Sequence, residues 1–196
     1  MKRAFDFLVA LIGLIVSSPV VAAAAVAVKL DSPGPAFFSG PRAGRDGTVF
    51  QIHKLRSMRV GADASGPAVT AGDDPRVTRV GRFLRRWKLD ELPQLLNVLK
   101  GEMSLVGPRP EDPRYVERYT PEQRRLLSVR PGVTGPSALS FLDEEEMLRG
   151  GQSEDRYLNE VMPRKLDLEL RYLDHATLAS DIGILLRTAG AVLGRR

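Results

Sequence analysis

The sequence predicts an α+β protein that is mainly helical. We expect a kinked, re-entrant N-terminal membrane helix, a small β-hairpin, and amphipathic interfacial helices around an acid pair, Asp90 and Glu91. Three observations predict this class. The run from Phe7 to Val28 is apolar and uncharged, Thr48 to Leu55 alternates with period two, and Leu92 to Leu99 repeats with helical period.

Length and composition limit the possible functions. A chain of 196 residues can bury a sizeable core, and we expect residues 1–31 as the membrane helix and 32–196 as one domain at the membrane interface. There is no cysteine, and the two histidines, His53 and His175, are far apart, so any metal is expected on oxygen ligands. A net charge of +5 predicts an anionic partner: nucleic acid, a phosphorylated ligand or an acidic lipid surface.

The apolar run is long enough, at about 33 Å as a helix, to match the hydrocarbon core of a bilayer. Three hypotheses compete: a cleaved signal peptide, a simple spanning anchor, and a re-entrant helix that returns to the same face. Pro19 removes a backbone hydrogen bond near the middle of the run, and the hydroxyls of Ser17 and Ser18 can satisfy the freed carbonyls. Ser18 and Pro19 are therefore the predicted helix break.

The residues that flank this run favour re-entry. Cations stand on both sides of it, Lys2 and Arg3 before it and Lys29 shortly after, so there is no clear positive-inside asymmetry. Arg3 and Asp6 are spaced i, i+3 and could neutralise each other at the interface. Both ends of the helix are thus expected on the cytoplasmic side.

A hairpin is expected after the break at Asp31–Pro35. Ala36 to Ser39 and Thr48 to Leu55 are the two strands, and the turn-rich segment Gly40 to Gly47 joins them. If the second strand is regular, Lys54 and Arg56 project from the same side. They are either phosphate-binding cations or ordinary solvated ones.

The acid pair is expected at a helix N-terminus. Residues 59–76 are rich in Gly, Ala, Asp and Pro and predict a mobile loop, followed by a helix from about Gly81. Pro93 is acceptable only in a first helical turn, so the next helix must begin near Asp90. Backbone N–H groups at that position also attract anions. The alternative is that the acids merely decorate a helix start.

Three further features are ambiguous. The acidic run Asp143 to Glu146 is interpreted as a solvated helix start. The segment Arg130 to Pro136 is expected to be a rigid turn cluster with Arg130 at its lip. The stripe formed by Leu178, Ile182, Leu185 and Leu186, followed by Arg187, Arg195 and Arg196, either lies on an anionic bilayer or packs on the core.

Taken in order, these segments resemble the bacterial sugar transferases, the small monotopic phosphoglycosyl transferases. Nine short segments carry the resemblance over nearly the whole chain. They are Lys2–Asp6, Ser18–Pro19, Asp31–Pro35, Lys54–Met58, Asp74–Thr78, Leu89–Gln94, Asn97–Gly101, Met103–Pro110 and Arg130–Gly135. Gly40 and the segment Pro136–Leu139 depart from the family pattern.

The resemblance implies transfer of a sugar 1-phosphate from a UDP-sugar to undecaprenyl phosphate, with release of UMP, as the first membrane step of glycoconjugate assembly. It implies Mg²⁺, a phospholipid bilayer as partner, and a catalytic domain on the cytoplasmic face of the bacterial inner membrane. No nucleic acid is expected; a homo-oligomer is possible.

The resemblance also implies residue roles. Asp90 corresponds to the nucleophile that forms a covalent phosphosugar intermediate, and Glu91 supports it in metal or proton handling, so both are candidate metal ligands. The cations at matching positions are expected to bind substrate phosphate. They are Lys54, Arg56, Arg85, Arg109 and Arg130.

Two rival classes remain open at this stage. A non-enzymatic membrane-anchored protein that binds acidic lipid or nucleic acid needs only the anchor and the charge, and does not explain the acid pair. A secreted protein with a cleaved signal peptide would have its mature N-terminus after about residue 20.

Overall fold

The computed structural model describes residues 1–62 and 64–194; Asp63 and the predicted basic end, Arg195 and Arg196, lie outside the described residues. The α-helices are α1 (Lys2–Asp31), α2 (Arg79–Arg86), α3 (Leu95–Lys100), α4 (Pro113–Val116), α5 (Pro136–Ser140), α6 (Glu144–Met147), α7 (Ser153–Arg156), α8 (Met162–His175) and α9 (Leu178–Leu193). The strands are β1 (Phe37–Ala43), β2 (Val49–Leu55), β3 (Ser104–Val106) and β4 (Gly132–Thr134). Short 3₁₀ helices are η1 (Arg45–Gly47), η2 (Leu89–Gln94) and η3 (Gln123–Ser128), and η4 (Tyr157–Val161) is a π-helical turn. The chain is thus mainly helical with a small hairpin, as predicted.

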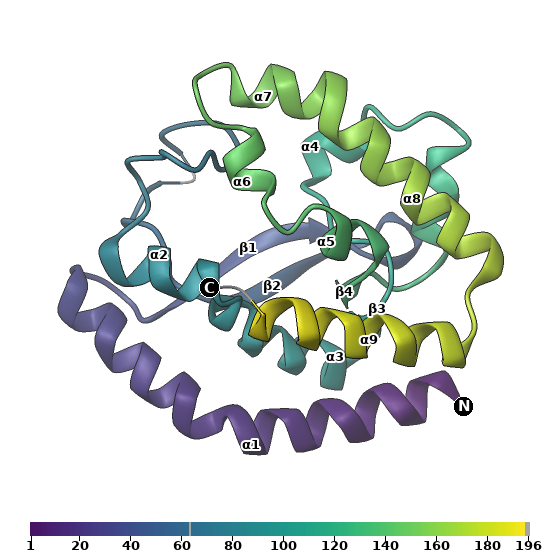
Figure 1. Cartoon of the computed structure of the whole chain (residues 1–196), viewed down its shortest axis with the longest axis horizontal. Coiled ribbons are helices and arrows are strands. Elements are labelled where there is room, and N and C mark those ends of the chain that lie inside the picture. The colour runs from purple at the N-terminus through teal and green to yellow at the C-terminus, as the bar shows by residue number, and fades with distance from the viewer. Residues whose placement is uncertain (63, 195–196) are drawn as a thin grey trace.

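Helix α1 lies along one edge of the molecule and bends along its course (Figure 1). It is the one helix, among the described residues, that is long and apolar enough to cross a membrane, with a mean hydropathy of 2.4 over its most apolar window. Only 11% of that window is buried, and Ile12 and Val16 are 61% and 72% exposed. A core helix would be buried, so this apolar surface fits a lipid environment.

The predicted compensation for Pro19 is present. In a regular helix the carbonyl of Ile15 would accept the N–H of residue 19, which proline lacks. The Ser18 hydroxyl donates to that carbonyl instead, at 2.8 Å. Helix α1 therefore continues through Pro19 to Asp31, and re-entry into one leaflet at this point stays a prediction.

The N-terminal end of α1 is fixed to the rest of the chain by polar contacts. Arg3 and Asp6, expected to neutralise each other, bind other partners. The Arg3 guanidinium donates to the carbonyls of Val98 and Leu99 at the end of α3. The buried Asp6 carboxylate accepts from the Ser104 hydroxyl at 2.8 Å.

The C-terminal end of α1 is fixed in the same way. The buried Arg56 guanidinium donates to the carbonyls of Ser32 and Pro33, at 2.8 and 2.6 Å. Asp31 accepts from the backbone N–H of Val80 in α2 at 2.9 Å. Both ends of the apolar helix are therefore held by the same folded domain.

The hairpin is antiparallel, and its register pairs Phe37 with Leu55 and Ala43 with Val49. Its first strand is longer than predicted, because residues 40–43 continue the ladder rather than the turn. The reversal is confined to Gly44–Thr48, where Asp46 adopts a left-handed conformation (φ 56°). Asp and Asn are the non-glycine residues that tolerate this region best.

A second, parallel pair of strands was not predicted. Strand β3 pairs with β4, with Ser104 opposite Gly132 and Val106 opposite Thr134. The expected turn cluster at Arg130–Pro136 therefore contains a strand. The backbones approach so closely that a Cβ on Gly132 would lie 2.2 Å from the nitrogen of Gly107, so the site accepts only glycine.

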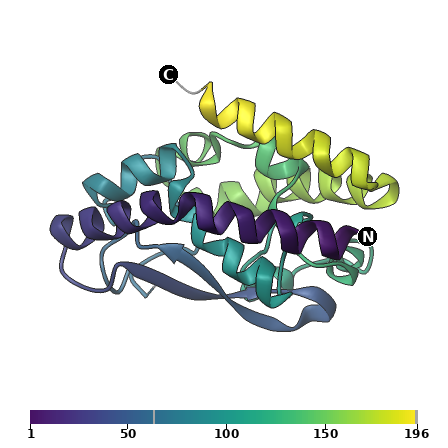
Figure 2. The same ribbon diagram turned by 90° about the horizontal axis from the view of Figure 1, so that it is seen from below.

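Helix α9 packs on the core through one face, and its contact with a bilayer stays a prediction. Ile184 is buried in the cluster that also contains Ala10 of α1 and Val98 of α3. Leu186 and Leu193, on the same helix, are 69% and 79% exposed. Figure 2 shows α1 and α9 as two long helices on the outside of the molecule.

Gly81 and Gly183 provide a matched test of this packing. A Cβ at Gly81 in α2 would lie 1.9 Å from the Ser57 carbonyl oxygen, whereas one at Gly183 in α9 meets nothing within 4 Å. We expect Gly81→Ala to lower the free energy of unfolding by about 1–3 kcal/mol through overpacking. Gly183→Ala should leave it unchanged or raise it by about 0.5–1 kcal/mol.

The measurement is denaturant unfolding of the full chain in one detergent. Equal stability of Gly81→Ala and wild type would show that α2 does not pack on the backbone of Ser57 in this way.

Candidate active site

The acid pair lies in the first turn of η2. This turn begins directly after Lys88, which adopts a left-handed conformation (φ 54°). The sequence predicted a helix start at this point; it is a 3₁₀ turn that contains Pro93, and α3 follows directly. Both carboxylates are buried, with Asp90 4% and Glu91 9% exposed. They therefore need partners that offset the loss of hydration.

Asn97 fixes this turn against the hairpin. Its side chain, fully buried, accepts from the backbone N–H of His53 at 3.0 Å and donates to the carbonyl of Gln51 at 2.7 Å. It also donates to Glu102 at 2.7 Å. Because Asn97 uses both strand groups, η2 and α3 cannot slide along β2 without losing buried hydrogen bonds.

Glu91 binds two of the predicted cations with one oxygen. Its Oε1 lies 3.0 Å from Lys54 Nζ on β2 and 3.2 Å from Arg109 Nη2 in the Pro108–Pro110 corner. Burial raises the pKa of Glu91, but the attraction of Lys54, Arg109 and Lys88 outweighs it and holds that pKa well below its ordinary value. Glu91 is therefore ionised at neutral pH.

Asp90 differs from its neighbour. Its Oδ1 is buried and has no hydrogen-bond partner in the described part of the chain. Burial raises the pKa of Asp90 above its ordinary value, and repulsion by Glu91 adds to this, while Lys54 and Arg85 oppose it. The adjacent acids are thus shifted in opposite directions, which is typical of acids with separate functions.

Arg85 lies at the end of α2, close enough to Asp90 to affect its charge. Its guanidinium pairs with Glu145 at 2.6 Å and donates to the Ser57 hydroxyl at 3.2 Å. Burial lowers the pKa of Arg85, but Glu145 outweighs this and raises it overall. Arg85 is therefore a fixed cation beside the acid pair.

Two predicted phosphate-binding cations have other partners. Arg56 holds the end of α1, as described above, since β2 ends at Leu55 and the alternation that would align Arg56 with Lys54 stops there. Arg130 donates to the carbonyl of Gly101 at 2.7 Å. Their phosphate roles stay predictions, and these contacts favour structural roles instead.

A large cavity adjoins Glu91, and Asp90 is not among the residues that line it. Its volume is about 820 Å³, and it lies between the hairpin, residues 57–62 and 67–70, and the segment around α5 and α6. Lys54, Arg85, Glu91 and Arg109 all contribute to its wall. The size suits a ligand larger than a single sugar ring.

The sequence missed several polar residues of this cavity. Glu144 and Glu145, interpreted as part of a solvated helix start, lie on its wall, as do Glu111, Tyr157 and Lys165. Lys165 pairs with Glu144 at 2.7 Å. Lys165 and Glu144 are far apart in the chain, so no local sequence pattern indicates that they pair. The acidic run that contains Glu144 was recognised in the sequence, but its place on the cavity wall was not.

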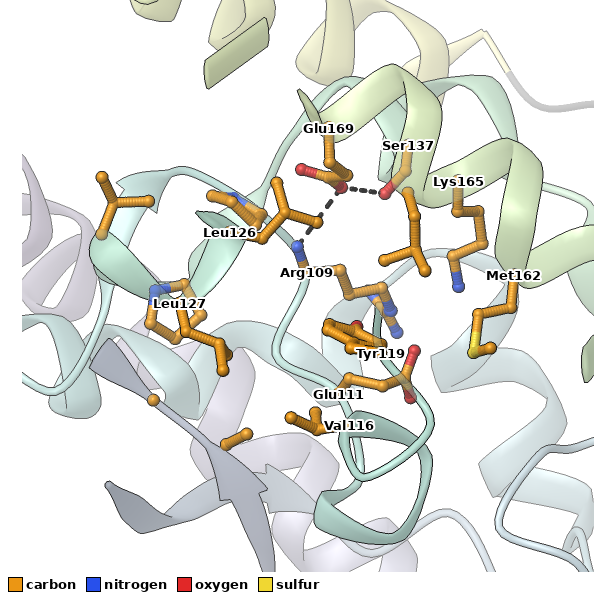
Figure 3. Close-up of a pocket in the computed structure, with 16 residues that line it drawn as sticks. Arg109, Glu111, Val116, Tyr119, Leu126, Leu127, Ser137, Met162, Lys165 and Glu169 are labelled. Atoms are coloured by element: carbon orange, nitrogen blue, oxygen red, sulfur yellow. Dashed lines mark hydrogen bonds between the residues drawn. The ribbon is translucent and has the colours of Figure 1, made fainter. Parts of the chain in front are cut away.

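A small cavity of about 30 Å³ lies behind Arg109 (Figure 3). Glu169 of α8 points into it, and its Oε1 accepts from the Arg109 backbone N–H at 3.3 Å and from the Ser137 hydroxyl. Burial raises the pKa of Glu169 to about 7. Helix α8 thus holds the backbone of the residue whose side chain reaches Glu91.

The residues present fit a magnesium ion only in part. Within residues 1–62 and 64–194, no three His, Cys, Asp or Glu side chains come together as a metal site. However, the unpartnered Asp90 Oδ1 is a free oxygen ligand, and Mg²⁺ is commonly held by one or two carboxylates with phosphate oxygens and water. Glu91 is less available, because its Oε1 already binds two cations.

The site is thus a buried acid pair among fixed cations, and it belongs to a chain whose N-terminal helix has an exposed apolar surface. The chain belongs to the bacterial sugar transferase family, whose model matches residues 1–195. It is therefore a transferase, and the non-enzymatic alternative is set aside.

Several relatives are similar over nearly the whole chain. A UDP-glucose:undecaprenyl-phosphate glucose-1-phosphate transferase of Caulobacter vibrioides is 41% identical, covering 98% of this chain and 69% of its own length. An Escherichia coli protein of the same name is 39% identical, covering 96% of this chain but only 39% of its own length. An exopolysaccharide production protein of Rhizobium leguminosarum is 37% identical and covers 100% of this chain and 96% of its own length. The chain thus matches nearly the whole of a short relative and only a part of a longer one.

Glu169 predicts a pH dependence of stability. The folded protein keeps its proton up to pH about 7, while an unfolded chain releases it near 4.5. The folded state binds more protons in this window, so the Glu169 contribution to stability falls as pH rises. Glu169→Gln cannot ionise, so this loss of unfolding free energy should be absent in the variant. Between pH 4.5 and 8, the free energy of unfolding of the variant minus that of wild type should therefore rise by at most about 3 kcal/mol.

Urea unfolding at several pH values measures this difference. Glu160→Gln, at an exposed position on η4, is the matched control and should follow wild type. A constant difference between Glu169→Gln and wild type across this range would contradict the prediction.

Proposed function

We propose that this protein transfers a sugar 1-phosphate from a UDP-sugar to undecaprenyl phosphate, releasing UMP, as the first membrane step in assembly of a lipid-linked glycan. The observation that carries the proposal is the free, buried Asp90 oxygen beside a Glu91 that is held by Lys54 and Arg109. The names of the relatives supply the substrates.

The first chemical step uses Asp90. A carboxylate oxygen of Asp90 attacks the phosphorus that bears the sugar, and the bond from that phosphorus to the UMP oxygen breaks. UMP leaves with the bonding electrons, and the phosphosugar is attached covalently to Asp90. Lys54, Arg85 and Arg109 stabilise the charge that develops on the phosphoryl oxygens.

The second step regenerates the carboxylate. A phosphate oxygen of undecaprenyl phosphate attacks the same phosphorus and expels Asp90, giving an undecaprenyl-diphosphate-linked sugar. The charge of Asp90 is the same before and after the two steps. Glu91 remains ionised throughout and keeps Lys54 and Arg109 in position.

A magnesium ion would bind Asp90, with diphosphate oxygens and water as the other ligands, and when bound it would neutralise negative charge on the diphosphate. Attraction by the cation would also oppose the effect of burial and favour the ionised form of Asp90. Glu91 is the second candidate ligand through its other oxygen.

We also propose that α1 is re-entrant and that the catalytic domain lies on the cytoplasmic face of the bacterial inner membrane, in contact with its phospholipids. The attachment of both helix ends to one folded domain supports this. Lys2 pairs with Asp181 of α9 at the start, and Arg56 binds the carbonyls after the end. A helix that spans the bilayer would place those ends on opposite faces.

The covalent mechanism predicts the effect of removing the nucleophile. Asp90→Asn should lower UMP release from UDP-sugar by roughly a thousandfold or more, because an amide cannot replace the attacking carboxylate. In intact-mass measurements without the acceptor lipid, wild type should gain the mass of one sugar phosphate and Asp90→Asn none. Asp167→Asn, at an exposed surface ion pair, is the control and should match wild type; near-normal turnover by Asp90→Asn would exclude Asp90 as nucleophile.

The topology can be tested separately. The sequence contains no cysteine, so Lys2→Cys and Asp46→Cys each introduce a unique thiol, one at the first residue of α1 and one in the hairpin turn. We expect an impermeant maleimide to label both in inverted inner-membrane vesicles and neither in right-side-out spheroplasts. Labelling of the two positions from opposite faces would mean that α1 spans the membrane.

A further inference from the structure

A second polar network lies on the cavity wall and has no place in the two chemical steps. The Tyr157 hydroxyl donates to Glu111 Oε2, and Lys165 Nζ lies 2.7 Å from Glu144 Oε2 and 3.3 Å from the Tyr157 oxygen. Lys165 also stands over the Tyr157 ring, 4.9 Å from its centre. Four side chains from three separate stretches of chain thus form one connected set of donors and acceptors.

This network faces the cavity that adjoins Glu91 and Arg109. All four of its residues contribute to the wall of the same cavity as Glu91 and Arg109. Glu111 follows the Pro108–Pro110 corner directly, and Glu144 and Glu111 lie close enough to Arg109 to stabilise its charge. The side chain of Glu144 keeps 24% of its surface exposed, so it can accept a ligand hydrogen bond.

The local backbone also points to function. Tyr157 begins the π-helical turn η4, which interrupts the passage from α7 to α8. Wide turns of this kind are rare and occur frequently at functional sites, because they are less favourable than a regular α-helix. Here the turn places Tyr157 at the cavity, with Lys165 two turns further along the chain.

The chemistry of the network selects among the parts of the two substrates. Glu111 and Glu144 would repel a phosphate, and the charged side chains exclude a polyprenyl chain. Carboxylates accept hydrogen bonds from hydroxyl groups, while the third N–H of the Lys165 ammonium supplies a donor. A neutral polyhydroxyl group therefore fits best.

We propose that Glu111, Glu144, Tyr157 and Lys165 form the subsite that binds the sugar ring of the donor and selects among sugars. This inference rests on the proposed function, in which Asp90 attacks the phosphorus that carries the sugar. In the proposed mechanism Arg109 stabilises the charge on that phosphoryl group. The sugar is bonded to the same group, so its ring must lie next to the phosphate that Arg109 contacts. A hydroxyl of the wrong configuration would leave a buried polar group unpaired, which is how such sites discriminate.

The test is the relative activity of the full-length protein in lipid nanodiscs toward different donors. UMP release is measured with undecaprenyl phosphate and four donors: UDP-glucose, UDP-galactose, UDP-N-acetylglucosamine and UDP-N-acetylgalactosamine. The variants are Glu111→Gln, Glu144→Gln and Tyr157→Phe, with Glu160→Gln as the exposed control on η4. We expect the ratio of kcat/KM between the preferred sugar and at least one other to change tenfold or more in a network variant, and to stay as in wild type in Glu160→Gln.

A merely structural network would lower kcat/KM for all four donors by a common factor. Ratios that stay within tenfold of wild type in all three network variants would therefore overturn the inference. If Tyr157→Phe fails to fold, Glu144→Gln decides alone, since its side chain lies at the cavity surface. Wild-type protein that releases no UMP from any donor would contradict the proposed function itself, and the sugar subsite with it.

Discussion

One carboxylate oxygen, Glu91 Oε1, holds together the segments that form the site. It binds Lys54 of β2 and Arg109 of the Pro108–Pro110 corner, and is itself part of η2. A buried carboxylate is tolerated only while its partners remain, and loss of one cation would leave a charge uncompensated. The hairpin, the 3₁₀ turn and the corner are thus fixed to one another by charge. Glu169 reinforces the arrangement from α8 through the backbone of Arg109.

This charge-based site is coupled to the membrane helix through the chain itself. Arg56, two residues after Lys54, donates to the carbonyls that follow α1 and so connects the end of that helix to the end of β2. At the other end, Asp6 and Arg3 bind β3 and the end of α3. The apolar helix therefore belongs to the folded domain, and any shift of α1 would act on the end of β2 and on α3 directly.

The sequence predicted those features that depend on neighbouring residues. Pro93 located the helix start at the acid pair, Ser18 was expected to compensate Pro19, and the alternation of residues 48–55 gave β2. The parallel pairing of β3 with β4, and the pairing of Arg85 with Glu145, join segments that are far apart in the chain, for which one sequence carries no periodic pattern. The contacts of Arg56 with the carbonyls of Ser32 and Pro33 likewise join distant segments, and its phosphate role stays a prediction.

The two adjacent acids have different surroundings, and this explains why they divide the proposed work. A carboxylate that is paired with several cations is strongly ionised, but its lone pairs are engaged and it is a poor nucleophile. Glu91 is in that state. By taking Lys54 and Arg109, it leaves Asp90 with a free oxygen in a buried setting that raises its basicity. The same cations that Glu91 holds then face the cavity, where an incoming diphosphate would compete for them. In the proposed mechanism, Glu91 would thus hold these cations in place until the substrate diphosphate binds them.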